Sequence, residues 1–326
     1  MSYRTIDDLM LHLRENGIEV HGADQRRLLL NTGYYHGYKG YRFFKDAAHR
    51  ISFHSYDEIY NTIQYDSKIK ALCYEKVVFI ETAVKNIALE SIIENIDSER
   101  IQDMFDKAIS SYKNSPETLD YKDKRRYQQN KLSLQSKIQS ILANEYRRND
   151  RRISHFYNND HYDGVPLWAL FEVVTMGNLG FLLQCLTFQI RDDLSRELRL
   201  DLSADTNREL IYKYIYALKD LRNAIAHNDV VFDGRFQNSD PSAPMRVCLK
   251  HEIGLQYVNF KSIGDYIILI CYLLDKLEVS KEETKKFIND FKNCTIEYQD
   301  KVSEDVASQV IKTDLFDRLD ILSDYL

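Results

Sequence analysis

Apolar residues recur at every third or fourth position along the stretch from Ile59 to Ile96. This spacing places them on one face of an α-helix, so it predicts a long helix, with a break near Asp66 and Ser67. Only 11 glycines and 4 prolines occur among the 326 residues. So few turn-forming residues disfavour a β-rich fold with many tight turns. We therefore expect an all-α protein.

The ends of the helices follow from polar caps and from glycines. Thr5, Ser55 and Thr206 each precede an acidic residue by three positions, which is the pattern of a capping box at a helix start. The glycines in 33–41 predict turns, and Gly177-Asn178 predicts a break between two helices. The expected helices span about 5–17, 24–31, 55–96, 99–112, 117–148, 167–177, 179–189, 206–228, 261–278, 280–293 and 304–324.

These helices suggest three regions along the chain. They are N-terminal helices with an aromatic, glycine-rich segment at 1–54, a helical core at 55–240 with a basic helical insertion at about 115–155, and a C-terminal helical region at 241–326. Within the last region, Val247 and Leu249, then Leu255 and Tyr257, alternate with polar residues. This pattern fits a small β-hairpin at 246–260.

Positive charge is concentrated in one stretch of an acidic chain. The formal net charge is -6, yet ten Lys and Arg residues lie between Tyr121 and His155, against three acidic residues. Such a stretch either is a solvated helix or binds a polyanion. Tyrosines interleave with the charges, and aromatic rings can stack on unpaired bases while Arg and Lys bind phosphates. The candidate RNA-binding residues are Lys122, Lys124, Arg125, Arg126, Arg147, Arg148, Arg151 and Arg152.

The cysteines and the hydropathy pattern bear on the cellular compartment. Five cysteines are scattered singly, and no Cys/His cluster has the spacing of a metal site. Three of them lie in apolar helical patterns, where a free Cys is usually a core residue. There is no apolar signal region and no apolar run of the ~18 residues that a membrane span needs. We expect a cytoplasmic protein with no membrane partner, metal or cofactor.

The segment Arg222-Asn223-Ala224-Ile225-Ala226-His227 carries the most chemical information. Cleavage of RNA without a metal uses the neighbouring 2′-OH as nucleophile, and a His can move protons to or from the reacting oxygens. An Arg can neutralise the charge that grows on the phosphate. Asn223 lies one helical turn before His227 and can orient the imidazole or the phosphate. Arg222, Asn223 and His227 are therefore the candidate catalytic residues.

A structural role also fits these residues. At about 100° per residue, Arg222 lies beside the apolar stripe of a regular helix and His227 lies about 140° away, unless the helix loosens after Ile225. Arg222 can pair with a carboxylate, for which Glu172 in an apolar helix is the candidate. His227 can simply be favoured by the helix dipole. Two copies facing each other across a two-fold axis would bring Arg222 and His227 into one cleft, so we expect a homodimer.

Several segments resemble, in the same order, motifs of the AbiD/AbiF-type abortive-infection proteins. They are Leu29-x4-Tyr34-Tyr35-x2-Gly37-Tyr38 followed by Phe43 and Phe53, then Tyr60-x4-Tyr65-Asp66, and Pro166–Leu179. The segment Arg222–His227 is similar to the motif of HEPN ribonuclease domains. Together the matches cover roughly residues 5–230.

The resemblance implies an all-α, HEPN-like helical bundle with additional N-terminal and C-terminal helices. It also implies a bacterial phage-defence role, RNA as substrate and, as for some AbiF-type proteins, a small non-coding RNA partner. We expect a metal-independent endoribonuclease that acts as a growth-arresting toxin. Two alternatives stay open: a non-catalytic protein whose HEPN core holds a structured non-coding RNA, and a regulatory protein–protein adaptor.

Overall fold

The structure of the protein, a computed structural model, describes residues 5–159, 161, 163–237 and 241–326. Its regular elements are helices, and strand pairing within these residues is limited to four isolated bridges. The expected all-α fold is therefore confirmed. No helix in the described part of the chain combines the length and the apolar character that crossing a bilayer requires.

The chain forms two compact units. The first contains Met1–Val77, Asp220–Asp240 and Leu249–Leu326, and the second contains Val78–Lys219 and Pro241–Cys248. Three helices contribute residues to both units: α3 (Tyr56–Ile96), α10 (Leu210–Ala226) and α11 (Ala243–Ile253). Each unit thus combines segments that are far apart in the sequence. The expected division into 1–54, 55–240 and 241–326 runs along the chain and stays a prediction.

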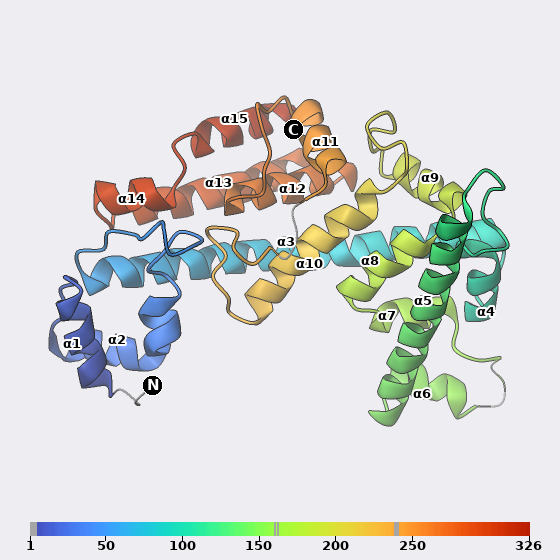
Figure 1. Ribbon diagram of the computed structural model, residues 1–326, viewed down its shortest axis with the longest axis horizontal. Coiled ribbons are helices and arrows are strands. Elements are labelled where there is room, and N and C mark those ends of the chain that lie inside the picture. The colour runs from blue at the N-terminus through green and yellow to red at the C-terminus, as the bar shows by residue number, and fades with distance from the viewer. Residues whose placement is uncertain (1–4, 160, 162, 238–240) are drawn as a thin grey trace. The chain divides into compact units, whose positions relative to one another are not determined.

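The first unit holds the helices from both ends of the chain (Figure 1). Its other elements are α1 (Ile6–Glu15), α2 (Gly22–Tyr34), the π-helix η1 (Tyr35–Lys39), α12 (Ile263–Lys276), α13 (Lys281–Gln299), α14 (Glu304–Val310) and α15 (Leu315–Tyr325). Every residue of α12 from Ile263 to Leu274 is buried, so α12 is the central helix of this unit. The start of α3 runs antiparallel to α13, because Thr62 contacts Tyr298 whereas Lys76 contacts Glu283.

The second unit is arranged around α5 (Tyr121–Arg147), which packs on α6, α7 and α8. Its other elements are α4 (Ile101–Asp103), the π-helix η2 (Met104–Ala108), α6 (Arg151–Tyr157), α7 (Leu167–Val173), α8 (Met176–Cys185) and α9 (Phe188–Glu197). The buried residues of α5 are Leu134, Ile138 and Leu142. Their four-residue spacing gives α5 one narrow apolar stripe, so most of its remaining surface stays polar.

Two of the three predicted capping boxes are confirmed, at Thr5 and Ser55. The third is wrong, because Asp205 and not Thr206 accepts the Glu209 N–H, at 2.7 Å, at the start of α10. A carboxylate is a stronger acceptor than a hydroxyl, and Asp205 is buried where that bond is worth most.

Helix breaks were harder to predict than helices. The helix α3 continues without interruption through Asp66 and Ser67, so the break expected there is wrong. The break expected at Gly177-Asn178 exists but lies about three residues earlier, because α7 ends at Val173, the Thr175 hydroxyl accepts the Asn178 N–H and α8 begins at Met176. A side-chain cap therefore decided the boundary, and the glycine lies inside the first turn of the helix.

Several other expected boundaries shift. The helix expected at 99–112 ends at Ala108, and the turns expected in 33–41 include η1. The helix expected at 179–189 is divided between α8 and α9. The helix expected at 304–324 is divided between α14 and α15. All five cysteines are free and buried, as expected for core residues.

The β-hairpin expected at 246–260 is wrong. Residues up to Ile253 belong to α11. The buried residues Met245, Cys248, Leu249 and Ile253 recur at three and four positions, which is the period of a helix. Over so short a stretch, alternation and helical spacing share too many positions to be told apart.

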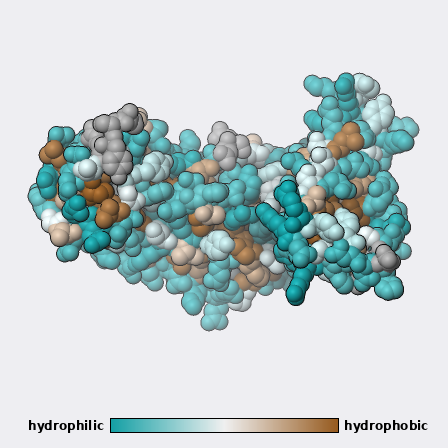
Figure 2. Space-filling view, turned by 90° about the horizontal axis from the view of Figure 1, so that it is seen from below, coloured by the Kyte–Doolittle hydropathy of each residue, from teal (hydrophilic) through white to brown (hydrophobic). Residues whose placement is uncertain are grey.

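The face of the protein shown in Figure 2 is mostly hydrophilic. Hydrophobic residues appear on it as small patches separated by polar side chains. Scattered exposure of this kind is ordinary for a protein surface, so the functional site has to be located from cavities and side-chain chemistry.

Candidate functional site

The helix α10 ends in a tight turn directly after the motif. The His227 N–H still bonds to the Asn223 carbonyl oxygen, at 2.9 Å, and the N–H groups of Asn228 and Asp229 then bond back to carbonyls of the last helical turn. Asn228 has a φ of 56°, a left-handed conformation that Asn tolerates better than most residues. This is a Schellman cap, and it makes His227 the last residue with helical hydrogen bonding.

Asn223 and His227 line the same cavity in the first unit. The cavity has a volume of about 310 Å³. Its lining residues on α10 are spaced by three and four positions, so they share one helical face. The complete lining is Tyr35, Asp220, Asn223, Ala224, His227, Asp229, Val230, Arg235 and Phe236.

The two motif residues in this cavity are available to a ligand. The His227 side chain is exposed and that of Asn223 is half-buried. Within the described part of the chain, neither side chain forms a hydrogen bond with another residue. Nor does any group of three His, Cys, Asp or Glu residues in that part have an arrangement that could hold a metal ion.

Arg222 does not belong to the lining of this cavity. The backbone of α10 stays helical up to His227, so no loosening after Ile225 brings the two side chains together. Arg222 lies about 140° around the helix from His227. On that side it accompanies the fully buried residues Ile215 and Leu218. Of the three candidate catalytic residues, the structure thus brings two together and leaves the third on another face.

Buried residues of α3 fix the turn that follows His227. Asp66 is fully buried and accepts hydrogen bonds from the backbone N–H groups of Val231 and Phe232, at 2.8 and 2.9 Å. Lys70 lies 2.8 Å from the Asp66 carboxylate and donates to Asn228 Oδ1 at 2.9 Å. The turn is thereby tied to the N-terminal half of α3.

Tyr41 completes this arrangement. Its hydroxyl donates to Asp66 at 2.9 Å. Burial of the ring and the negative charge of Asp66 raise the pKa of Tyr41, so it remains a neutral donor. We call Tyr41, Asp66, Lys70 and Asn228 the Asp66 brace.

A second buried carboxylate, Asp233, holds the other wall of the cavity. It accepts the Lys45 N–H at 2.5 Å and binds the Arg235 guanidinium through several hydrogen bonds. The same guanidinium donates to the carbonyl oxygens of Gly40, at 2.7 Å, and Phe43. The segment after η1 is therefore fastened to the loop after α10.

A close backbone approach brings Tyr35 to the cavity. A Cβ atom on Gly40 would lie 3.1 Å from the Tyr35 carbonyl oxygen and 3.5 Å from the Val230 side chain. Only glycine fits there without displacing a neighbour. The Tyr35 side chain is 54% exposed, so its ring is open to a ligand.

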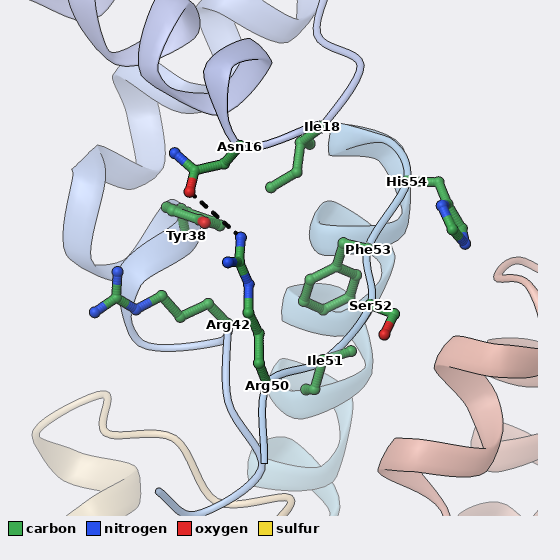
Figure 3. A pocket seen from close by; sticks show the side chains of 9 residues that line it. All are labelled: Asn16, Ile18, Tyr38, Arg42, Arg50, Ile51, Ser52, Phe53 and His54. Atoms are coloured by element: carbon green, nitrogen blue, oxygen red, sulfur yellow. Dashed lines mark hydrogen bonds between the residues drawn. The ribbon is translucent and has the colours of Figure 1, made fainter. Parts of the chain in front are cut away.

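A smaller cavity, of about 240 Å³, lies beside the same segment (Figure 3). Arg50 reaches across it and donates to Asn16 Oδ1 at 3.4 Å, with Ile18 and Phe53 on one side and Tyr38 on the other. This volume is below the usual range for ligand pockets. We therefore regard this cavity as part of the scaffold that supports η1.

A family model described as Abi-like protein matches residues 27–233. The match covers more than half of the chain and includes the Asp66 brace and the whole of α10. The chain belongs to the Abi-like protein family. No curated protein and no solved structure gives a significant match to it.

In the second unit of the Abi-like protein, Glu172 is exposed. We expected Glu172 to pair with Arg222 because a carboxylate buried in an apolar helix needs a partner. An exposed carboxylate is hydrated by water and has no such need. The pairing itself stays a prediction.

The eight candidate RNA-binding residues of the Abi-like protein form two separate clusters. The leading cluster is Lys122, Lys124, Arg125 and Arg126 at the start of α5, and the trailing cluster is Arg147, Arg148, Arg151 and Arg152 at the end of α5 and the start of α6. At a rise of 1.5 Å per residue, the backbones at Arg125 and Arg148 are about 35 Å apart.

Local ion pairs weaken both clusters. Asp123 lies 3.0 Å from Arg126, Glu145 lies 3.1 Å from Arg148, and Asp150 lies 2.7 Å from Arg152. These contacts are largely exposed, so they reduce the positive charge without fixing the side chains strongly.

Neither the full Asp66 brace nor the Arg235–Asp233 pair was predicted from the sequence. The Asp66–Lys70 pair was readable in part, because two ionisable residues four positions apart interrupt an otherwise apolar helical pattern. Their partners at 228–232 could not be inferred, since they lie about 160 positions later in the chain.

Proposed function

We propose that this Abi-like protein acts in phage defence in the cytoplasm as a metal-independent, HEPN-type endoribonuclease, with His227 as the residue that transfers protons. One observation carries the proposal. The side chains of His227 and Asn223 share one helical face, make no hydrogen bond to other described residues and line a cavity. The Asp66 brace holds the turn beside them rigid. Membership of the Abi-like family supports the defence role.

The chemistry needs an imidazole and the ribose of the substrate. His227 takes the proton from a 2′-OH while that oxygen forms a bond to the adjacent phosphorus. The bond from phosphorus to the 5′-oxygen breaks, and the leaving oxygen takes a proton from water or from a second imidazole. The products carry a 2′,3′-cyclic phosphate and a 5′-OH. Asn223 orients the imidazole or the phosphate from the same helical face.

The cavity has no free positive charge among its lining residues, so the proposal includes a second copy of the chain that supplies one. Its lining carries the carboxylates of Asp220 and Asp229, and its guanidinium, Arg235, is already neutralised by Asp233. A phosphodiester therefore needs a cation from elsewhere. Arg222 is not among the residues that line the cavity of its own chain. In a two-fold dimer, Arg222 of the second copy supplies the missing charge.

RNA is held in this proposal by the two basic clusters. Exposed Arg and Lys side chains bind phosphates without reading the sequence. The spacing of about 35 Å suits an extended or structured RNA better than a short one. A small non-coding RNA can occupy the same clusters as a partner.

A second candidate function is non-catalytic RNA binding. The exposed carboxylate of Asp229 favours it, because it repels a phosphate from the cavity. In this case the HEPN-like core holds a structured non-coding RNA through the basic clusters, and no strand is cut.

Incubation of the purified protein with total RNA separates the two functions. We expect cleavage that a chelator does not reduce, with fragments that end in 2′,3′-cyclic phosphate and begin with 5′-OH. His227→Ala should abolish it, whereas His251→Ala, at an exposed His of the same unit, should not. Intact RNA that co-purifies and stays uncut would favour the second function. Cleavage that stops with the chelator would show that the metal-independent mechanism is wrong.

A further inference from the structure

A further cavity in the second unit shares no lining residue with the cavity that holds His227. It has a volume of about 790 Å³, against about 310 Å³ for the cavity that holds His227. Its walls come from the 110–119 loop, the start of α5, the start of α9 and the segment 207–212. We call it the α5–α9 groove. Its volume lies well inside the range of small-molecule sites.

The lining of the α5–α9 groove is polar without being strongly charged. Asp123 and Glu209 balance Arg126 and Arg191. Five side-chain amides line it, from Asn114, Asn130, Gln184, Gln189 and Asn207. An amide offers both a donor and an acceptor, as the edge of a nucleobase does. Such a lining suits an uncharged polar group better than a bare phosphate.

Part of this polar lining is unused. Gln184 accepts from Tyr216, and Gln189 donates to Asp193. By contrast, the side-chain amides of Asn130 and Asn207 form no hydrogen bond with another residue among those that the structure describes. Arg191 also has a buried Nε without a hydrogen-bond partner. A buried donor of this kind is costly unless a ligand accepts from it.

Aromatic side chains in the lining of the groove could stack on a base. Tyr127, Phe188 and Tyr212 line the groove, and the Phe188 ring is 49% exposed although it is fully apolar. The neighbouring residues Tyr112 and Tyr121 are also exposed, with ring centroids 6.2 Å apart. The face of an aromatic ring binds any nucleobase, because every base has a π-face.

We propose that the α5–α9 groove binds an unpaired ribonucleotide, with its base stacked on Phe188 and hydrogen-bonded to the free amides, and its phosphate at Arg126 and Arg191. The inference rests on RNA as the ligand of the proposed function, but it concerns a site outside the His227 cavity. The leading cluster lies next to the groove in sequence, because Arg126 belongs to both. The groove would therefore select single-stranded or bulged RNA at that cluster, while a fully paired helix, whose bases are stacked inside, would not enter.

The test measures binding of the full chain carrying His227→Ala, so that the RNA stays intact. The probes are an unstructured oligoribonucleotide, the same strand annealed in a duplex, and a free mononucleotide. Phe188→Ala should weaken single-strand binding about tenfold or more and leave duplex binding unchanged. The matched control is Phe79→Ala, at another exposed Phe of the same unit. The exposed Asn207→Ala gives a second variant that does not disturb the core.

Cross-linking with 4-thiouridine in the single strand locates the base. Cross-links to groove peptides together with the Phe188→Ala effect support the proposal. Equal binding of the duplex and the single strand, or cross-links elsewhere, would overturn it, even if the protein cleaves RNA. Groove cross-links from a protein that never cleaves would support the groove and reject the catalytic function instead.

Discussion

His227 owes its setting to residues that lie far from it in the chain. Asp66 and Lys70 reach the turn at 228–232 across about 160 positions. Both are nearly or fully buried, and Asp66 accepts three hydrogen bonds and forms an ion pair with Lys70. A buried charge with this many partners is stable only while the whole set is present.

The first prediction concerns the motif. Arg222→Ala and His227→Ala should each abolish growth inhibition while leaving the fold intact. Removing a group that stabilises charge or transfers a proton typically lowers the rate by about 10²-fold or more. Circular dichroism checks the fold, and induction in cells together with an RNA cleavage assay checks activity. Arg27→Ala, at an exposed Arg of the same unit, is the control for Arg222→Ala. If both motif variants are as toxic as the parent, the catalytic assignment is wrong.

The second prediction concerns the Asp66 brace. Lys70→Met keeps the length of the side chain but leaves the Asp66 charge buried without its counter-ion. We expect the free energy of unfolding to fall by about 3 kcal/mol. Lys68→Met is the matched control: it removes an exposed Lys of the same helix that pairs with the exposed Glu297, and it should cost less than about 1 kcal/mol.

Urea denaturation measures both Lys variants. The brace also predicts that Lys70→Met loses RNA cleavage at temperatures where it is still folded, because Asn228 is no longer held. Equal stability of the Lys70→Met and Lys68→Met variants would show that the brace contributes nothing to the turn.

At the scale of elements, the sequence predicted which segments are helical far better than where they end. Periodic apolar residues identify α3 and α12 because a buried face repeats over many turns. Ends depend on single contacts, such as Asp205 at α10 or Thr175 at α8. The break wrongly predicted at Asp66 has the same cause. An ionisable residue in an apolar helical pattern suggests a break, unless its buried partners are known.

The third prediction belongs to α5 and α6, whose basic residues fall at two ends. Reversing the charge of Lys122, Lys124 and Arg125 should weaken RNA binding and flatten its salt dependence, since fewer counterions are released. Reversing Arg147, Arg148 and Arg151 should do the same independently, because the two clusters lie about 35 Å apart. Binding is measured at several salt concentrations.

The two charge reversals should add when they are combined. Their additivity is expected because well-separated phosphate contacts are independent. A salt slope that neither reversal changes would show that RNA, if bound, contacts another surface. A charge-neutral shuffle within α5, such as exchange of Lys122 and Gln129, is the control for disturbance of the helix.

At the scale of the whole molecule, the motif raises the question of assembly. His227 and Asn223 could be predicted as neighbours because they are four residues apart on a helix. The distance of Arg222 from them also followed from the helical period. Tyr35, Asp229 and Arg235 could not be placed at the cavity, since loops and a π-helix bring them there.

The fourth prediction is that the active protein is a homodimer. We expect an Arg222→Ala subunit mixed with a His227→Ala subunit to regain part of the cleavage activity, because one of the two clefts then holds an intact Arg and an intact His. Cleavage is measured as the ratio of the two variants is varied, with size-exclusion chromatography and light scattering to give the mass. Each variant alone is the control. A strictly monomeric protein that cleaves RNA would contradict this prediction and leave the first one standing.

The Asp66 brace would also shape how the protein loses its toxicity by mutation. If expression of the protein arrests growth, survivors carry inactivating substitutions. Substitutions at Asp66, Lys70 or Asn228 offer further routes to inactivity, because they release the turn beside His227. The positions of the inactivating substitutions would therefore extend beyond the proposed catalytic residues, into the N-terminal half of α3.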